Sequence, residues 1–66
     1  MTNKLKVLRA EHSLSQEDLA RIIGVSRQTI NALEKGKYVA STVLSLKIAR
    51  HFNVALEHIF QLDEND

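Results

Sequence analysis

The sequence has no cysteine, no proline and no tryptophan, and only two glycines among its 66 residues. Without cysteine the chain can form neither a disulfide nor a thiolate metal site, which is compatible with a reducing compartment. Without proline, and with glycine only at Gly24 and Gly36, the stretches of helix-forming residues are long and uninterrupted. These absences favour a helical protein whose fold does not depend on cross-links.

The chain also lacks any long apolar run. No segment approaches the ~20 apolar residues that cross a bilayer, and no apolar segment follows the polar start MTNKLK as in a signal peptide. Sixty-six residues form one small domain, whose core is marginally stable and often relies on a partner chain. We therefore expect a cytoplasmic protein without a membrane, with one domain over residues 1–62 and a frayed acidic tail at 63–66.

The charges are unevenly distributed along the chain. The formal net charge is only +1, but residues 1–51 hold all nine Lys and Arg and carry +5. Residues 52–66 hold no Lys or Arg and carry −4. A basic body beside an acidic end indicates a polyanionic partner on one side. An ordinary mixed surface with a solvated acidic end explains the same charges equally well.

Apolar spacing and capping residues predict five helices. The first covers residues 3–11. The second begins after Ser15, which forms a weak capping box with Asp18 three residues later. It ends at Gly24, a residue suited to a left-handed C-cap.

The remaining three helices follow the same pattern. Ser26 caps the third, which Gly36 ends, and Ser41 caps the fourth, which Asn53 ends. A fifth, short helix follows. The apolar residues expected on the inner faces of the five helices are Leu5, Leu8, Leu19, Ala20, Ile22, Ile23, Ile30, Leu33, Leu44, Ile48, Phe52, Leu56, Ile59 and Phe60.

The segment QEDLARIIGVSRQTINAL has the features of a helix-turn-helix. Two helices joined by a short turn cross steeply where the first helix offers a small residue, and Ala20 is in that position. Gly24 can adopt the positive φ that the turn needs. The apolar residues placed to hold the crossing angle are Val25, Ile30 and Leu33.

The segment LSQEDLARIIGVSRQTINALEKGK, residues 14–37, resembles the lambda-repressor-like, Cro-type helix-turn-helix family, also called the xenobiotic-response-element family. The resemblance extends over nearly the whole chain, including the IFQL ending at 59–62. It implies an all-α, five-helix DNA-binding domain with the helix-turn-helix at the second and third helices. Compact relatives further imply that the chain ends pair as short strands, with Thr2-Asn3-Lys4 beside Phe60-Gln61-Leu62.

The family's second motif helix enters the major groove of DNA with its N-terminal residues nearest the base edges. We therefore assign base reading to Arg27, Gln28, Thr29 and Asn31. Gln28 can bind adenine through both atoms of its amide, and Arg27 can bind guanine or a phosphate. The alternative for each of these residues is a merely solvated position on an exposed helix face.

Other polar residues flank the motif and are expected to contact phosphates. Gln16 begins the first motif helix, where free backbone amides and the helix dipole attract anions, and it matches a phosphate anchor of the family. The alternative for Gln16 is a plain helix-start residue. The complete set of expected phosphate contacts is Gln16, Ser26, Lys35, Lys37, Tyr38 and Ser41.

Three further features bear on the match with the family. Arg9 and Glu34 match a structural ion pair between the first and third helices, which we favour over DNA contact for Arg9. Ser13 stands where glycine is common, so a left-handed turn there carries strain. Val39 and Ala40 replace a polar residue and a proline, so Val39 is expected to touch a partner chain or to pack.

Specific sites are usually bound by two-fold dimers, and the apolar residues near the chain end are candidates for the interface. We assign the homodimer contact to Ile59, Phe60 and Leu62. The alternative is that these residues close the core of the monomer. The expected function is a repressor that binds a palindromic operator on double-stranded DNA. A protein-interaction module of the same fold, antitoxin-like or an antagonist, is the competing hypothesis.

The sequence gives little support for metal binding or catalysis. His51 and His58 are seven residues apart across the Asn53 break, and no cysteine or further histidine lies at metal-ligand spacing. The prominent serines are explained as helix caps, and no glycine-rich phosphate loop exists. We therefore expect no enzyme activity, no metal, no cofactor and no small-molecule ligand.

Overall fold

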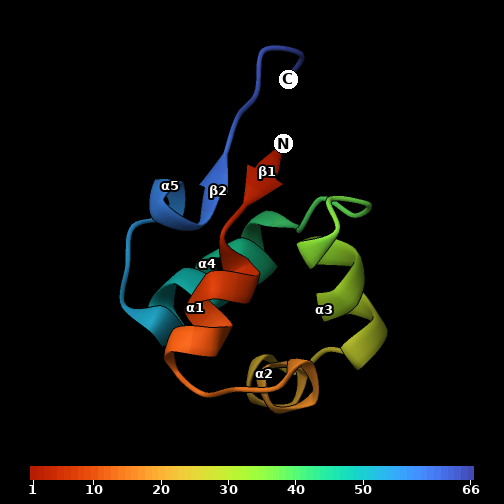
Figure 1. The fold of residues 1–66 in the computed structure, drawn as a ribbon, viewed down its shortest axis with the longest axis vertical. Coiled ribbons are helices and arrows are strands. Elements are labelled where there is room, and N and C mark those ends of the chain that lie inside the picture. The colour runs from red at the N-terminus through yellow and green to blue at the C-terminus, as the bar shows by residue number, and fades with distance from the viewer.

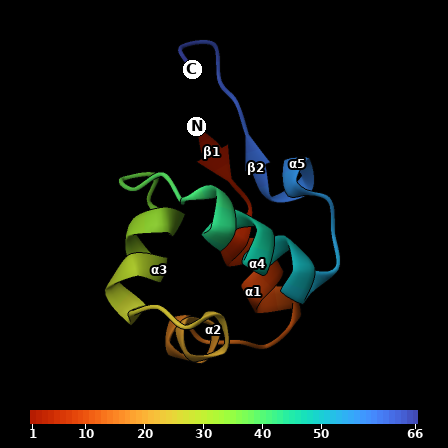
Figure 2. The same cartoon turned by 180° about the vertical axis from the view of Figure 1, so that it is seen from behind.

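The computed structural model describes all 66 residues and contains five helices and one pair of short strands. Both termini lie at one end of the longest axis, α2 lies at the opposite end, and α3 forms one side of the molecule (Figures 1 and 2). The predicted helical fold with a terminal β pairing is confirmed. The elements are β1 (Thr2–Asn3), α1 (Leu5–Glu11), α2 (Gln16–Ile23), α3 (Arg27–Glu34), α4 (Thr42–Phe52), α5 (Leu56–Ile59) and β2 (Phe60–Gln61).

One cluster of apolar side chains forms the core, and all five helices contribute to it. Leu14, Val25 and Phe60 pack against its edge. No helix has the length and apolar character that a membrane crossing requires. The eleven buried residues are Leu5, Leu8, Leu19, Ala20, Ile23, Ile30, Leu33, Leu44, Ile48, Phe52 and Ile59.

Two predictions for apolar residues differ from the structure. Ile22 was expected inside, but its side chain is 48% exposed because the buried stripe of α2 follows Leu19, Ala20 and Ile23. Ile59 was assigned to a dimer interface, and this assignment is wrong. Its side chain is 0% exposed and lies in the core of the single chain, so it cannot contact a second copy.

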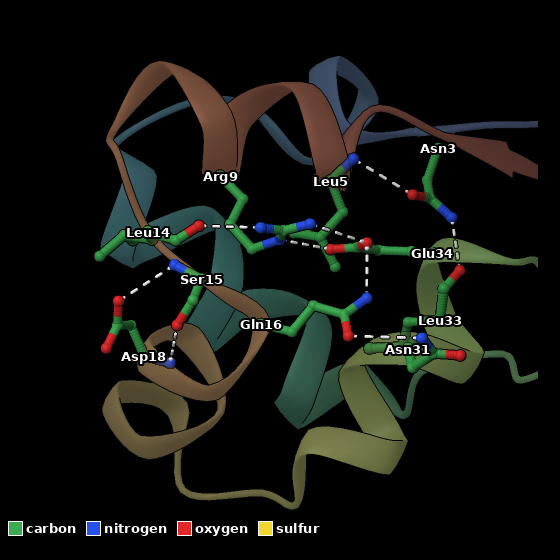
Figure 3. Close-up of polar contacts among 10 residues, drawn as sticks. All are labelled: Asn3, Leu5, Arg9, Leu14, Ser15, Gln16, Asp18, Asn31, Leu33 and Glu34. Atoms are coloured by element: carbon green, nitrogen blue, oxygen red, sulfur yellow. Dashed lines mark hydrogen bonds and ion pairs between the residues drawn. The ribbon is translucent and has the colours of Figure 1, made fainter.

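The two chain ends form an antiparallel pair in which Thr2 faces Gln61 and Asn3 faces Phe60. The first helix consequently begins at Leu5 and not at Asn3 as predicted. The Asn3 side chain joins two elements, since its Oδ1 accepts from the Leu5 N–H at 3.1 Å and its Nδ2 donates to the Leu33 carbonyl at 2.7 Å (Figure 3). The paired ends are thereby fastened to the last turn of α3.

Serine caps set the start of α2, α3 and α4. Ser15 accepts from the Asp18 N–H at 2.9 Å while Asp18 accepts from the Ser15 N–H at 3.0 Å, which is the predicted capping box. Ser26 and Ser41 accept from the amides of the third helical residues, as predicted. These caps satisfy backbone donors that have no partner inside the helix.

The two turns that flank α2 each contain a residue with a positive φ angle, which is a glycine in one turn and a serine in the other. Gly24 ends α2 at φ +89°, and Ser13 adopts φ +55° between α1 and α2, as the sequence indicated. A side chain in this left-handed region costs roughly 1–2 kcal/mol, which glycine avoids. We expect Gly24→Ala to lower the free energy of unfolding by about 1 kcal/mol and Ser13→Gly to raise it by up to about 1 kcal/mol. Urea denaturation measures both, and a change of the same sign in both variants would contradict this account.

Candidate nucleic-acid interface

The turn between α2 and α3 sets how α3 is presented. The N–H groups of Gly24 and Val25 both donate to the Ala20 carbonyl, at 2.8 and 3.0 Å, and so close α2 before the chain turns. On α3, Ile30 and Leu33 are buried against the core. Because one face of α3 is buried, its opposite face points to solvent, away from α5 (Figures 1 and 2).

The outward face of α3 is polar and basic. Arg27 and Gln28 at its N-terminus are exposed and have no side-chain hydrogen bond within the chain. Together with Asn31 they line a shallow surface hollow of about 330 Å³, and Lys35 and Lys37 continue that lining. This face combines free amide and guanidinium donors with two ammonium groups, so it suits a ligand with both hydrogen-bonding edges and negative charge.

Two residues of the predicted interface are engaged in capping α3. Ser26 Oγ accepts from the Thr29 N–H at 3.1 Å and lies 2.9 Å from Thr29 Oγ1. The Thr29 side chain is half-buried, whereas Ser26 is exposed. The methyl group of Thr29 is consequently better placed for an outside contact than its hydroxyl, which bonds to Ser26.

Polar side chains from α1, α2 and α3 meet in one network beside this face (Figure 3). Arg9 donates to both carboxylate oxygens of Glu34, at 2.7 and 3.2 Å, and to the Leu14 carbonyl at 2.8 Å. Gln16 Nε2 donates to Glu34 at 3.1 Å, and Gln16 Oε1 accepts from Asn31 Nδ2 at 3.3 Å. The expected ion pair is therefore present and continues through Gln16 to the recognition face.

The network keeps Glu34 ionised. Burial by itself raises the pKa of Glu34, but hydrogen bonds from Arg9 and Gln16 and the charges of Arg9 and Lys6 outweigh it, so its pKa lies below the ordinary value. The hydrogen bond to Glu34 likewise raises the pKa of Arg9. At neutral pH the pair is a carboxylate facing a guanidinium, with side chains only 6% and 15% exposed.

The loop after α3 supplies the remaining predicted phosphate contacts. Lys35, Lys37 and Tyr38 are exposed, and Ser41 is exposed at the start of α4. Val39, expected to pack or to meet a partner, is 69% exposed and lies outside the core cluster and the residues packed against it. The loop therefore extends the polar edge of α3 toward the amides that open α4.

Sequence reasoning missed two residues beside this surface. Lys6 lines a second hollow of about 360 Å³ together with Gln16, Asn31 and Lys35. Asn3 holds the Leu33 carbonyl near the end of α3. Lys6 and Asn3 precede the motif, and only the packing of α1 and β1 against α3 brings them there. No local pattern could have identified them.

Comparison with known proteins identifies this geometry. A helix-turn-helix family matches residues 5–59, which is most of the chain. The chain belongs to the helix-turn-helix family. The uncharacterized HTH-type transcriptional regulator MJ0272 of Methanocaldococcus jannaschii is 56% identical to this helix-turn-helix protein over 66 residues, covering 100% of both chains. YgzD of Bacillus subtilis, also named an uncharacterized HTH-type transcriptional regulator, is 48% identical over 66 residues and is likewise covered in full.

A solved structure has the same fold. The restriction-modification controller protein C.AhdI from Aeromonas hydrophila superposes on this helix-turn-helix protein with a TM-score of 0.77 and 33% sequence identity, covering 86% of each chain. The match supports the lambda-repressor-like fold that the sequence predicted. The predicted family is therefore confirmed over the complete motif.

Proposed function

We propose that this helix-turn-helix protein is a transcriptional regulator that binds double-stranded DNA sequence-specifically and represses by occupying an operator. The observation that carries the proposal is the exposed position of Arg27 and Gln28 on the outward face of α3, while Ile30 and Leu33 hold its inner face in the core. A helix presented in this way can enter the major groove and place its first residues at base edges. The names of the relatives, HTH-type transcriptional regulators, support it.

Base reading and backbone contact divide along the surface. Arg27 and Gln28 are the principal base-reading residues, joined by Asn31 and by the methyl group of Thr29. Phosphate contact falls to residues that flank α3 on both sides, because such contacts fix the register of a protein on DNA. These residues are Gln16, Ser26, Lys35, Lys37, Tyr38 and Ser41.

We further propose a homodimer on an inverted repeat. Half-sites of such operators lie about 34 Å apart. The longest dimension of the chain is 32 Å, and the terminal strands lie at one end of that axis (Figure 1). We propose that two copies join at this end through Phe60 and Leu62. Leu62 is 79% exposed and free to form such a contact.

The proposed activity is binding without catalysis, in the cytoplasm. Serine hydroxyls at the proposed interface are engaged in helix capping, since Ser26 accepts from the Thr29 N–H and Ser41 from the Leu44 N–H. The hydroxyls therefore contribute to local structure and are not poised as nucleophiles.

Selection of bound sites from random duplex DNA tests the function. The expected result is one enriched inverted repeat whose half-sites are about one turn apart. An enriched single half-site would retain DNA reading and overturn the dimer. A featureless pool would contradict the regulator and favour a protein-interaction module of the same fold.

Binding to the selected site is expected to weaken steeply with salt. If each subunit neutralises about four phosphates, the slope of log affinity against log salt for the dimer is about −7. Replacing one phosphate contact, as in Lys37→Gln, is expected to reduce the steepness by about one for each subunit. Fluorescence anisotropy at several salt concentrations measures the slope, and a slope near zero contradicts the proposed interface.

A further inference from the structure

A series of hydrogen bonds leads from the Arg9–Glu34 ion pair to the recognition face (Figure 3). Glu34 Oε1 accepts from Gln16 Nε2 at 3.1 Å, and Gln16 Oε1 accepts from Asn31 Nδ2 at 3.3 Å. Gln16 comes from the first turn of α2, and Asn31 from the middle of α3. Gln16 thus stands between the buried carboxylate and a side chain that lines both surface hollows beside α3.

The carboxylate of Glu34 gives this series of hydrogen bonds a direction. An ionised carboxylate only accepts hydrogen bonds, so Gln16 must turn its NH₂ group toward Glu34. Its carbonyl then faces Asn31, and a carbonyl also only accepts, so Asn31 must turn its own NH₂ group toward Gln16. One charge at the inner end therefore sets the orientation of two amides that could each otherwise adopt either of two orientations.

The outer end of the hydrogen-bond series is an acceptor. Asn31 Oδ1 has no hydrogen-bond partner within the chain and points away from Gln16 (Figure 3). In the major groove adenine and cytosine present amino donors, whereas guanine N7 and O6 and thymine O4 are acceptors. An outward carbonyl matches the first pair of bases and is electrostatically opposed by the second.

We propose that Glu34 is a positioning residue that makes Asn31 select a base with an amino donor, adenine or cytosine, at one position of each half-site. The proposal rests on the proposed DNA-binding function and assigns the specificity of that surface to a residue that does not touch DNA. Gln16 transmits the orientation and need not contact a base. Burial disfavours the charge on Glu34, but the bonds and charges around it keep its pKa below the ordinary value, so the orientation persists at neutral pH.

Two variants of the ion pair separate positioning from stability. Glu34→Gln keeps the size of the side chain but can offer either an NH₂ or a carbonyl group to Gln16, so the series of hydrogen bonds loses its direction. Arg9→Lys keeps the charge on Glu34 and the direction of the hydrogen bonds, although it loses the two-point contact of the guanidinium. Both variants weaken the ion pair, and only Glu34→Gln frees Asn31 to turn.

The readout is base preference at one position. Asn31→Ala first identifies the position, because its preference disappears in sites selected from random duplexes. At that position we expect wild type and Arg9→Lys to prefer adenine or cytosine about tenfold, and Glu34→Gln to show about threefold or less. Preferences at other positions should remain as in wild type. Equal preference in Glu34→Gln and wild type overturns the proposal, as does a wild-type preference for guanine or thymine.

A third variant and a DNA-free measurement complete the test. Gln16→Met leaves the ion pair intact and should relax the same position, while its lost phosphate contact weakens all sites uniformly. In the free proteins, the side-chain NH₂ signals of Asn31 in NMR spectra should move in Glu34→Gln and Gln16→Met but not in Arg9→Lys. Unmoved signals in all three variants contradict the proposed series of hydrogen bonds from Glu34 through Gln16 to Asn31. Failure of wild type to select any site rejects the proposed function, whereas a selected site with unchanged variants rejects only this inference.

Discussion

Replacing Arg27 and Gln28 by alanine is expected to abolish preference for the selected site while leaving the fold intact. Each bidentate base contact contributes roughly 1–3 kcal/mol of discrimination, so each single variant should lose roughly 5- to 150-fold in affinity for the specific site. The double variant should approach the affinity for unrelated duplex DNA. Competition binding against a scrambled duplex measures this loss.

Stability is the control for this prediction. Both side chains are exposed and form no hydrogen bond within the chain, so their removal should change the free energy of unfolding by no more than about 0.5 kcal/mol. A matched variant on another exposed surface is Arg50→Ala, which should bind the site nearly as wild type does. Loss of the helical circular-dichroism signal in both interface variants would remove the role assigned to this face.

The largest effect on stability is expected from Arg9→Ala. Glu34 would then lie in a site only 6% exposed without its cation, and breaking a buried pair by removing one partner costs about 3–5 kcal/mol. For a domain of this size about 3 kcal/mol corresponds to a fall in melting temperature of roughly 12–24 °C. Thermal unfolding followed by circular dichroism measures it.

The loss in Arg9→Ala should depend on pH. In wild type the pKa of Glu34 is lowered, so its contribution to stability is fully present above the unfolded-chain value of 4.5 and is lost as pH falls through the folded pKa. In Arg9→Ala only the Gln16 hydrogen bond and the charge of Lys6 still oppose the effect of burial, so the pKa of Glu34 rises and protonation relieves the unpaired charge. The difference between the proteins should therefore be largest near pH 7 and smaller near pH 3. A difference that does not change with pH contradicts the charge as its source.

A double variant distinguishes the charge from the packing. Arg9→Met combined with Glu34→Leu removes both charges and keeps apolar volume, and such replacements are often neutral or stabilising. We expect this protein to be more stable than Arg9→Ala. Because it also removes the carboxylate that orients Gln16, it should share the relaxed base preference of Glu34→Gln. Stability and specificity are thereby separated within one ion pair.

The helices and the motif could be predicted because their signals are local. A serine at an N-cap acts on amides two or three residues away, and Gly24 adopts positive φ because of its own missing side chain. Ser15, Ser26 and Ser41 therefore marked three helix starts correctly, and Asn53 ended α4 in the left-handed conformation as predicted.

What depends on contacts between distant segments was less predictable. Ile59 is apolar and near the chain end, which fits an interface and a core equally well until the pairing of β1 with β2 is known. The bonds of Asn3 to α3 and of Gln16 to Asn31 join residues 30 and 15 positions apart in the chain. Their polar side chains carry no periodic signal, so the hydrogen bonds emerge only from the packed structure.

The outward face of α3 is expected to contact the base edges of DNA. Titration of the labelled protein with its selected duplex, followed by amide and side-chain NMR shifts, tests this claim most directly. The largest changes are expected at residues 26–31 and at the flanking positions 16 and 35–41, including the free side chains of Arg27 and Gln28. Changes centred instead on α5 and β2, with α3 unaffected, would contradict it.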